Sequence, residues 1–205
     1  NIFEGQFGFC NVYCGEKFYD LSKMVEAIGN PFEIYSPGVD LKLYPSCSRT
    51  HTGIDAILSL IKEHNLTPEE VERIDCGVRY TTPLSLIHPN PKTGLEGQFS
   101  MGFCIAVALV DRKVSIEQFA DEKVNDPRVQ KLMKKFHLYI REDLKGVESS
   151  SSNACTLKIR MRSGKIYEKS IDKNKGSAQN PLSKVELENK FRDGAKAVLS
   201  ERQID

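Results

Sequence analysis

The 205-residue sequence lacks a strong excess of either charge. Its 29 Lys and Arg residues nearly balance 28 Asp and Glu residues, which leaves a formal net charge of +1. Without a basic excess, nothing draws the chain as a whole to nucleic acid or to an anionic membrane surface. It also lacks any apolar run of the roughly 20 residues that a bilayer-spanning helix needs. We therefore expect no nucleic-acid and no membrane partner, and any anionic ligand must be small and bound locally.

Clustered thiols are also missing, because the six cysteines form no C-x-x-C pair. Zinc and iron–sulfur sites need clustered thiolates, so we expect no bound metal. Scattered cysteines in apolar segments are typical of reduced thiols in a reducing compartment, which predicts a cytoplasmic protein. The chain begins at Asn1 without an initiating Met or a signal-peptide pattern. We expect it to be part of a longer protein, so organellar targeting by an earlier segment stays open.

Hydrophobic periodicity and turn residues predict the elements. Helices are expected over 20–29, 50–64, 98–110, 115–119, 127–136 and 183–200, and a strand over 71–80. Two hairpins are expected, over 32–44 with its turn at 36–38 and over 155–171 with its turn at Ser163-Gly164. A polar loop is expected over 149–153.

Hairpins separated by helices favour an α+β fold, a two-layer sandwich of a mainly hairpin-built sheet with helices packed on it. We expect a connecting segment with a short helix over 1–30, an α+β cap domain over 31–175, and a linker followed by the start of a helical segment over 176–205.

The stretch from Lys42 to His51 is the first candidate site. Lys42 is expected on a strand that Pro45 ends, and a polar turn then leads into a helix. Unpaired N–H groups and the positive dipole end at a helix start favour an anion. Arg49 is suited to gripping a carboxylate in two places, and His51 to donating to one or shuttling a proton. The predicted substrate-binding residues are Ser46, Cys47, Ser48, Arg49 and Thr50.

A simpler interpretation is open for the same stretch: Ser48 or Thr50 caps the helix, Lys42 and Arg49 are solvated, and His51 lies on the surface. A second candidate, 94–101, has two glycines that permit close backbone approach. There Glu96 and Ser100 either face a ligand or belong to the start of the following helix.

Two stretches carry a resemblance to a known family. KLYPSCSRTHTGID at 42–55 and GLEGQFSMGFCIAVALVDRKVSIEQFADEKVNDPRVQKLM at 94–133 resemble the MmgE/PrpD family, as do EGQFGF near the start and NPLSKVELENKF near the end. This family includes 2-methylcitrate dehydratases, cis-aconitate decarboxylases and an epimerase. The resemblance implies a helical domain and a smaller α+β cap, with the active site between them and no metal or organic cofactor.

The resemblance places this chain in the cap, so it implies that the main helical domain of the same protein is missing, that the full-length enzyme is a homodimer, and that this chain alone is inactive. Lys42 and His51 match family positions and become the candidate catalytic residues. Cys47 stands where cis-aconitate decarboxylase carries a functional histidine, and Pro83 stands near the place of its tyrosine, with Tyr80 three residues earlier. These departures indicate another member of the family.

Three functions follow as hypotheses. The first is a cofactor-independent lyase, a dehydratase or decarboxylase, acting on a small di- or tricarboxylate such as 2-methylcitrate or cis-aconitate. The second is an epimerase or isomerase of the same family. The third is a non-catalytic acid-binding or assembly module.

Overall fold

A computed structural model describes residues 2–15, 18–26, 28–32, 34–36, 38–144 and 153–204. The chain divides into two compact units, Asn1–Val39 and Asp40–Asp205. In the first unit, two short helices are described, α1 (Phe9–Cys14) and α2 (Leu21–Glu26). Cys10 is buried there, whereas Phe7 and Phe18 are 86% and 85% exposed. This unit therefore buries little apolar surface of its own.

The second unit holds a four-stranded sheet in the order β2-β1-β3-β4. Its strands are β1 (Val71–Val78), β2 (Phe136–Ile140), β3 (Cys155–Met161) and β4 (Ile166–Ile171). β3 and β4 form the predicted antiparallel hairpin, and β1 pairs antiparallel with β3. β1 and β2 run parallel, so the sheet is mixed and one of its pairs needs a long crossover.

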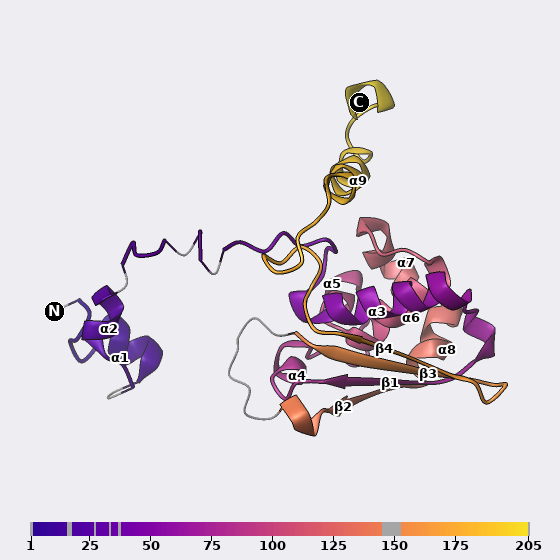
Figure 1. Cartoon of the computed structure of the whole chain (residues 1–205), viewed down its shortest axis with the longest axis horizontal. Helices are drawn as coiled ribbons and strands as arrows, with labels where there is room; N and C mark the ends of the chain where they lie inside the picture. The colour runs from indigo at the N-terminus through magenta and orange to yellow at the C-terminus, as the bar shows by residue number, and fades with distance from the viewer. Residues whose placement is uncertain are drawn as a thin grey trace. The chain divides into compact units, whose positions relative to one another are not determined.

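The longer helices α3 (Ser48–His64), α6 (Met101–Asp111) and α8 (Pro127–Met133) lie together on one face of this sheet (Figure 1). The predicted α+β class is thereby confirmed. Apart from α9 (Lys184–Ala195), the other described helices of the unit are short. Together with the 3₁₀ turns they are η1 (Pro68–Glu70), α4 (Thr82–Ser85), α5 (Gly94–Gly97), η2 (Ile116–Phe119), α7 (Asp121–Val124), η3 (Glu142–Leu144) and α10 (Glu201–Ile204).

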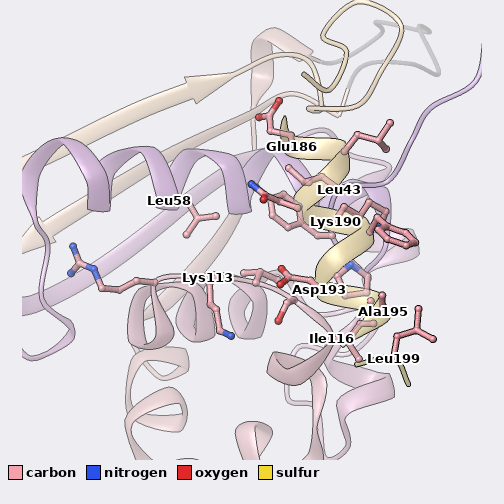
Figure 2. Close-up of a pocket in the computed structure, with 18 of the residues that line it drawn as sticks. Leu43, Leu58, Lys113, Ile116, Glu186, Lys190, Asp193, Ala195 and Leu199 are labelled. Carbon is pink, nitrogen blue, oxygen red and sulfur yellow. The ribbon is translucent and has the colours of Figure 1, made fainter. Parts of the chain in front are cut away.

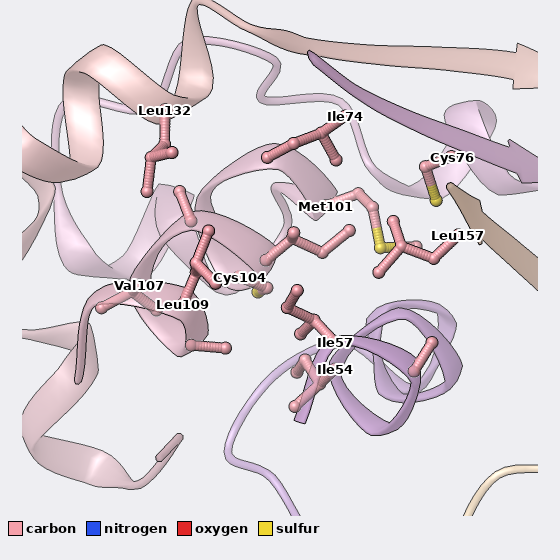
Figure 3. Packing of buried hydrophobic residues seen from close by; sticks show 14 of the residues in the cluster. Ile54, Ile57, Ile74, Cys76, Met101, Cys104, Val107, Leu109, Leu132 and Leu157 are labelled. Carbon is pink, nitrogen blue, oxygen red and sulfur yellow. The ribbon is translucent and has the colours of Figure 1, made fainter. Parts of the chain in front are cut away.

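The core lies between the sheet and helices α3 and α6, and Figure 3 shows its packing. Ile54 and Ile57 of α3, Ile74 of β1 and Leu157 of β3 are fully buried in it. α3 and α6 approach closely at Gly53, where an added Cβ would lie 2.5 Å from Sδ of Met101. The apolar residues of these two helices therefore build the core.

Two predicted elements are wrong. The expected hairpin over 32–44 is not formed, because the described residues there are turns and irregular backbone without a ladder partner. Its turn residue Pro37, like most of the predicted loop over 149–153, lies outside the described residues. The helix expected over 127–136 ends at Met133, and Phe136 opens β2 instead. The residues of β2 alternate in exposure, as expected for a strand with one covered face.

Among the described residues, no helix has the length and apolar character needed to cross a membrane.

Candidate functional site

Two long-range hydrogen bonds hold the segment that enters α3. The Leu41 N–H donates to the Gly176 carbonyl at 2.8 Å, and the Cys47 N–H donates to the Gln98 carbonyl at 2.9 Å. Lys42 is exposed and sits on irregular backbone, so the expectation that a strand carries it is wrong. Because both ends of the segment are tied to other parts of the unit, the residues between them have a defined position despite forming no strand.

The hydroxyls predicted to bind substrate are engaged locally. Oγ of Ser46 and Oγ1 of Thr50 lie 2.8 Å apart, and Thr50 also donates to the Cys47 carbonyl at 2.8 Å. Both residues are buried. Cys47 is the N-cap residue and its side chain makes no capping hydrogen bond, so neither Ser48 nor Thr50 is the cap. The Ser46–Thr50 pair shapes the turn before α3 rather than facing an open surface.

Two asparagines far along the chain fix the first turn of α3. The Ser48 carbonyl accepts from Nδ2 of Asn153 at 3.4 Å and from Nδ2 of Asn174 at 3.2 Å. Thr52 donates to the Asn153 carbonyl at 2.5 Å. Sequence reasoning missed both asparagines, because they lie more than 100 residues from Ser48 and no local pattern marks them. The candidate site is thus assembled by tertiary contacts.

Arg49 points toward the end of β1. Its Nη1 donates to Oγ1 of Thr81 at 3.0 Å, and the side chain is half-buried. Within the described ranges it pairs with no carboxylate, so its positive charge is not neutralised there. One face of the guanidinium remains for a further acceptor, because a single hydrogen bond uses one of its five N–H groups.

His51 is buried, with 1% of its surface exposed, so the interpretation of it as a surface residue is wrong. Burial lowers its pKa to about 4, and the positive charges of Lys42 and Lys190 act in the same direction. Hydrogen bonds to the backbone of Ser46 and Tyr44 oppose this shift. The imidazole is therefore neutral at pH 7, and Lys42 lies close enough to His51 to act on it electrostatically.

The two ring nitrogens of His51 have different roles. Nε2 is buried and has no hydrogen-bond partner among the described residues. The bonds to backbone carbonyls raise the pKa, which means that the ring donates through Nδ1. In the neutral form Nε2 then carries a lone pair and no proton. His51 is suited to accepting a proton or a hydrogen bond, and not to donating one to a carboxylate.

Tyr44 and Asp55 form a buried pair beside His51, and sequence reasoning missed both as site residues. The Tyr44 ring meets the His51 ring edge-on with centroids 5.2 Å apart. Tyr44 donates its hydroxyl hydrogen to Oδ1 of Asp55 at 2.7 Å, and the Lys175 N–H donates to Oδ2 at 3.3 Å. Burial raises the pKa of Tyr44 and that of Asp55. The pair packs against the imidazole and leaves its Nε2 without a hydrogen-bond partner among the described residues.

A groove opens next to this cluster, with a volume of about 1010 Å³ (Figure 2). Leu43, Tyr44 and Pro45 form part of one wall and α9 forms the other, with Lys190 and Phe191 among its lining residues. The lining is mainly apolar, and its charged residues are Arg112, Lys113, Glu186, Lys190 and Asp193. A groove of this size with a mainly apolar lining and several charged groups has the character of a small-molecule site.

The second candidate stretch is structural in part. Ser100 is buried and its Oγ accepts from the Phe103 N–H at 3.3 Å, which caps α6. Oε2 of Glu96 accepts from the Lys92 N–H at 2.6 Å within the turn that precedes α6. Ser100 therefore belongs to the start of α6 as its cap. Glu96 stabilises the turn in which it lies.

The cysteines are all free, and four of the six are buried. Cys47 is half-buried at the start of α3, and burial raises the pKa of the nearby Cys104 to about 12. No group of three or more His, Cys, Asp or Glu side chains is arranged to hold a metal ion in the part of the chain that the structure describes.

Comparison with known proteins gives a consistent result. The model of the MmgE/PrpD C-terminal domain matches residues 44–205. Cis-aconitate decarboxylase of Mus musculus is 27% identical over 174 residues, which are 82% of this chain and 35% of that protein. The enzyme of the same name from Homo sapiens is 27% identical over 79% of this chain and 34% of its own length. That from Aspergillus terreus is 23% identical over 91% and 39%. The chain spans little more than a third of the length of these relatives.

Proposed function

Since the chain belongs to the MmgE/PrpD family, we propose that it forms the carboxylate-binding cap of a cofactor-independent lyase acting on a small di- or tricarboxylate. One observation carries this proposal: a neutral, buried His51 with an unengaged Nε2 lies within electrostatic reach of Lys42, at the start of a helix of 17 residues. The relatives named cis-aconitate decarboxylase support the same substrate class.

The proposed chemistry is the breaking of a bond beside a carboxylate, either C–O, C–H or C–CO₂⁻. Negative charge develops next to the carboxylate, and Lys42 stabilises it. The helix start adds about 0.3–1 kcal/mol for an exposed anion, whereas a charge-assisted hydrogen bond adds about 1.5–3 kcal/mol. The side chains must therefore dominate binding. Nε2 of His51 receives a proton or a hydrogen bond, because its lone pair is not used by the protein.

Cys47 bears on which member of the family this is. The resemblance implies that this thiol stands where the family's cis-aconitate decarboxylases carry a functional histidine. A thiol is a weaker hydrogen-bond donor than an imidazole. We therefore favour dehydration of a hydroxylated acid such as 2-methylcitrate over decarboxylation of cis-aconitate.

The proposed active site is shared with a helical domain outside this chain, and the full-length enzyme is proposed to be a homodimer. The low pKa of His51, about 4, also fits a second candidate, an acid-binding module without proton transfer, because so weak a base is a poor general base at pH 7. The two differ in one outcome: the cap of an enzyme restores turnover when joined to its helical domain, and a binding module does not.

The test uses the full-length enzyme that contains this chain. Lys42→Ala is expected to lower kcat/KM at least tenfold, a loss of about 1.4 kcal/mol. Lys184→Ala is the matched control, because Lys184 is 89% exposed and does not line the groove. Wild-type kinetics in Lys42→Ala would refute the proposed role of this residue.

A further inference from the structure

Lys190 on α9 is a positive charge without a carboxylate partner in the described part of the chain. The acidic neighbours on the same helix are engaged elsewhere. Glu186, one turn earlier, pairs with Lys175 at 3.2 Å and completes the capping box with Ser183. Asp193 pairs with Lys196 at 3.1 Å. The Lys190 ammonium group is thus available to an anion that is not part of these residues.

The groove brings Lys190 of α9 close to the candidate site. Lys190 lines the same groove as Leu43, Tyr44 and Pro45, the three residues that directly follow Lys42 (Figure 2). The Tyr44 ring in turn contacts His51 at 5.2 Å between centroids. The positive charges of both lysines act on the His51 imidazole. Two cations from segments far apart in the sequence therefore flank one neutral imidazole.

We propose that Lys190 binds a second carboxylate of the ligand whose first carboxylate is held at Lys42. α9 then makes the site prefer acids with two or three carboxylates over acids with one. This inference rests on the proposed function and adds a specificity residue to it. The apolar walls between the cationic positions suit the hydrocarbon part of a di- or tricarboxylate. A monocarboxylate fills the Lys42 position alone and gains nothing from α9.

The charge of Lys190 is the property that matters under this proposal. An ammonium–carboxylate contact that is partly exposed to solvent raises the binding affinity about tenfold, and added salt weakens this contribution. The loss should depend on the ligand: removing the Lys190 charge weakens acids that have a second carboxylate and leaves a monocarboxylate unchanged. A structural role for Lys190 would weaken all acids alike, which makes the ligand series diagnostic.

The experiment is calorimetric binding to the full-length enzyme that contains this chain, at fixed low salt, with three non-reacting acids: tricarballylate, glutarate and butyrate. The variants are Lys190→Gln, Lys190→Arg, Lys42→Gln and the control Lys184→Gln. Lys190→Gln should weaken tricarballylate and glutarate about tenfold and leave butyrate unchanged. Lys190→Arg should retain most of the preference, because the charge remains. Lys184→Gln should bind all three acids as the wild type does.

The outcomes separate this inference from the proposed function. If Lys190→Gln binds all three acids as tightly as wild type, or loses affinity for all three equally, the inference is wrong. If Lys190→Gln fails in this way but Lys42→Gln weakens binding of all three acids, only the inference about Lys190 is wrong, and the carboxylate site at Lys42 stands. If the wild-type full-length enzyme binds none of the acids, both are wrong.

Discussion

Helices α3 and α9 both carry an apolar stripe, but their burial differs. α3 buries nine of its 17 residues against the sheet and α6. α9 is described in full and buries only Ala195, while Leu187 and Phe191 remain 47% and 57% exposed. The difference shows that an apolar stripe predicts which face of a helix makes contacts, but not which part of the protein that face contacts. α3 is part of the core of this unit, and the apolar face of α9 forms one wall of an open groove.

The largest expected effect concerns matched truncations on the two helices. Ile57→Ala, in the core side of α3, should lower the free energy of unfolding by about 2–5 kcal/mol, because the cavity is enclosed on all sides. Leu187→Ala on α9 should change it by less than about 0.5 kcal/mol. Chemical denaturation monitored by circular dichroism measures both. Equal losses would show that α9 is packed as tightly as α3.

The second expected effect is a dependence of stability on pH. It arises on α3, because this helix carries the buried imidazole of His51. His51 has a pKa of about 4 in the folded protein, against 6.5 ordinarily. The unfolded chain therefore binds more protons between these values, so stability is fully present above pH 6.5 and lost as the pH falls toward 4. The loss should be on the order of 3 kcal/mol.

Asp55 has the opposite effect on stability as the pH falls, because its pKa is raised in the folded state and the folded protein binds its proton more readily than the unfolded chain does. The His51 contribution is therefore measured as the difference between wild type and His51→Gln in urea unfolding at pH 7 and pH 4.5. The variant should lose less stability than wild type over this interval. Identical losses would mean that His51 is not buried in the neutral form.

Glycines provide a third contrast. Gly53→Ala on α3 places a Cβ 2.5 Å from Sδ of Met101, which should cost about 1–3 kcal/mol through displacement of that side chain. Gly194→Ala on α9 meets no atom within 4 Å and should raise helicity, by up to about 1 kcal/mol of helix propensity. Thermal unfolding of the pair gives opposite signs if the two helices are packed as described.

The smallest expected effect is at the helix starts. Ser183 caps α9, with its Oγ accepting from the Glu186 N–H at 3.3 Å, whereas α3 starts without a side-chain cap. Ser183→Ala should therefore lower the stability of α9 by about 1 kcal/mol. Ser48→Ala, at the first position of α3, should have no measurable effect. Amide hydrogen exchange measures the protection at the start of each helix separately. Equal changes in protection for the two variants would contradict a cap at Ser183 and no side-chain cap on α3.

The sequence predicts elements whose stabilising contacts are local or periodic. The stripe on α3, the Ser100 cap of α6 and the hairpin turn at Ser163-Gly164 are all confirmed. The hairpin over 32–44 is wrong because alternating residues form a strand only when a neighbour completes the ladder. β2 was missed for the converse reason. Its five residues are stabilised by pairing with β1, which lies far earlier in the chain and pairs Ile74 with Phe136 and Val78 with Ile140.

The candidate site was predictable in position but not in composition. The pattern from Lys42 to His51 indicates a helix start with cations, and α3 does start there. The asparagines at 153 and 174 and the Tyr44–Asp55 pair follow from tertiary packing, which no local spacing records. Whether His51 is neutral also depends on burial by distant segments.

The parallel pairing of β1 with β2 has a consequence for biosynthesis. β1 is an inner strand, and both of its neighbours emerge from the ribosome later, β2 from Phe136 and β3 from Cys155. At about 5–20 residues per second, the strand waits for several seconds with its backbone unpaired. α3 and α6 are completed in this interval or before it, so the nascent chain collapses first as helices on a single strand. Sheet formation is the late step of this unit during translation.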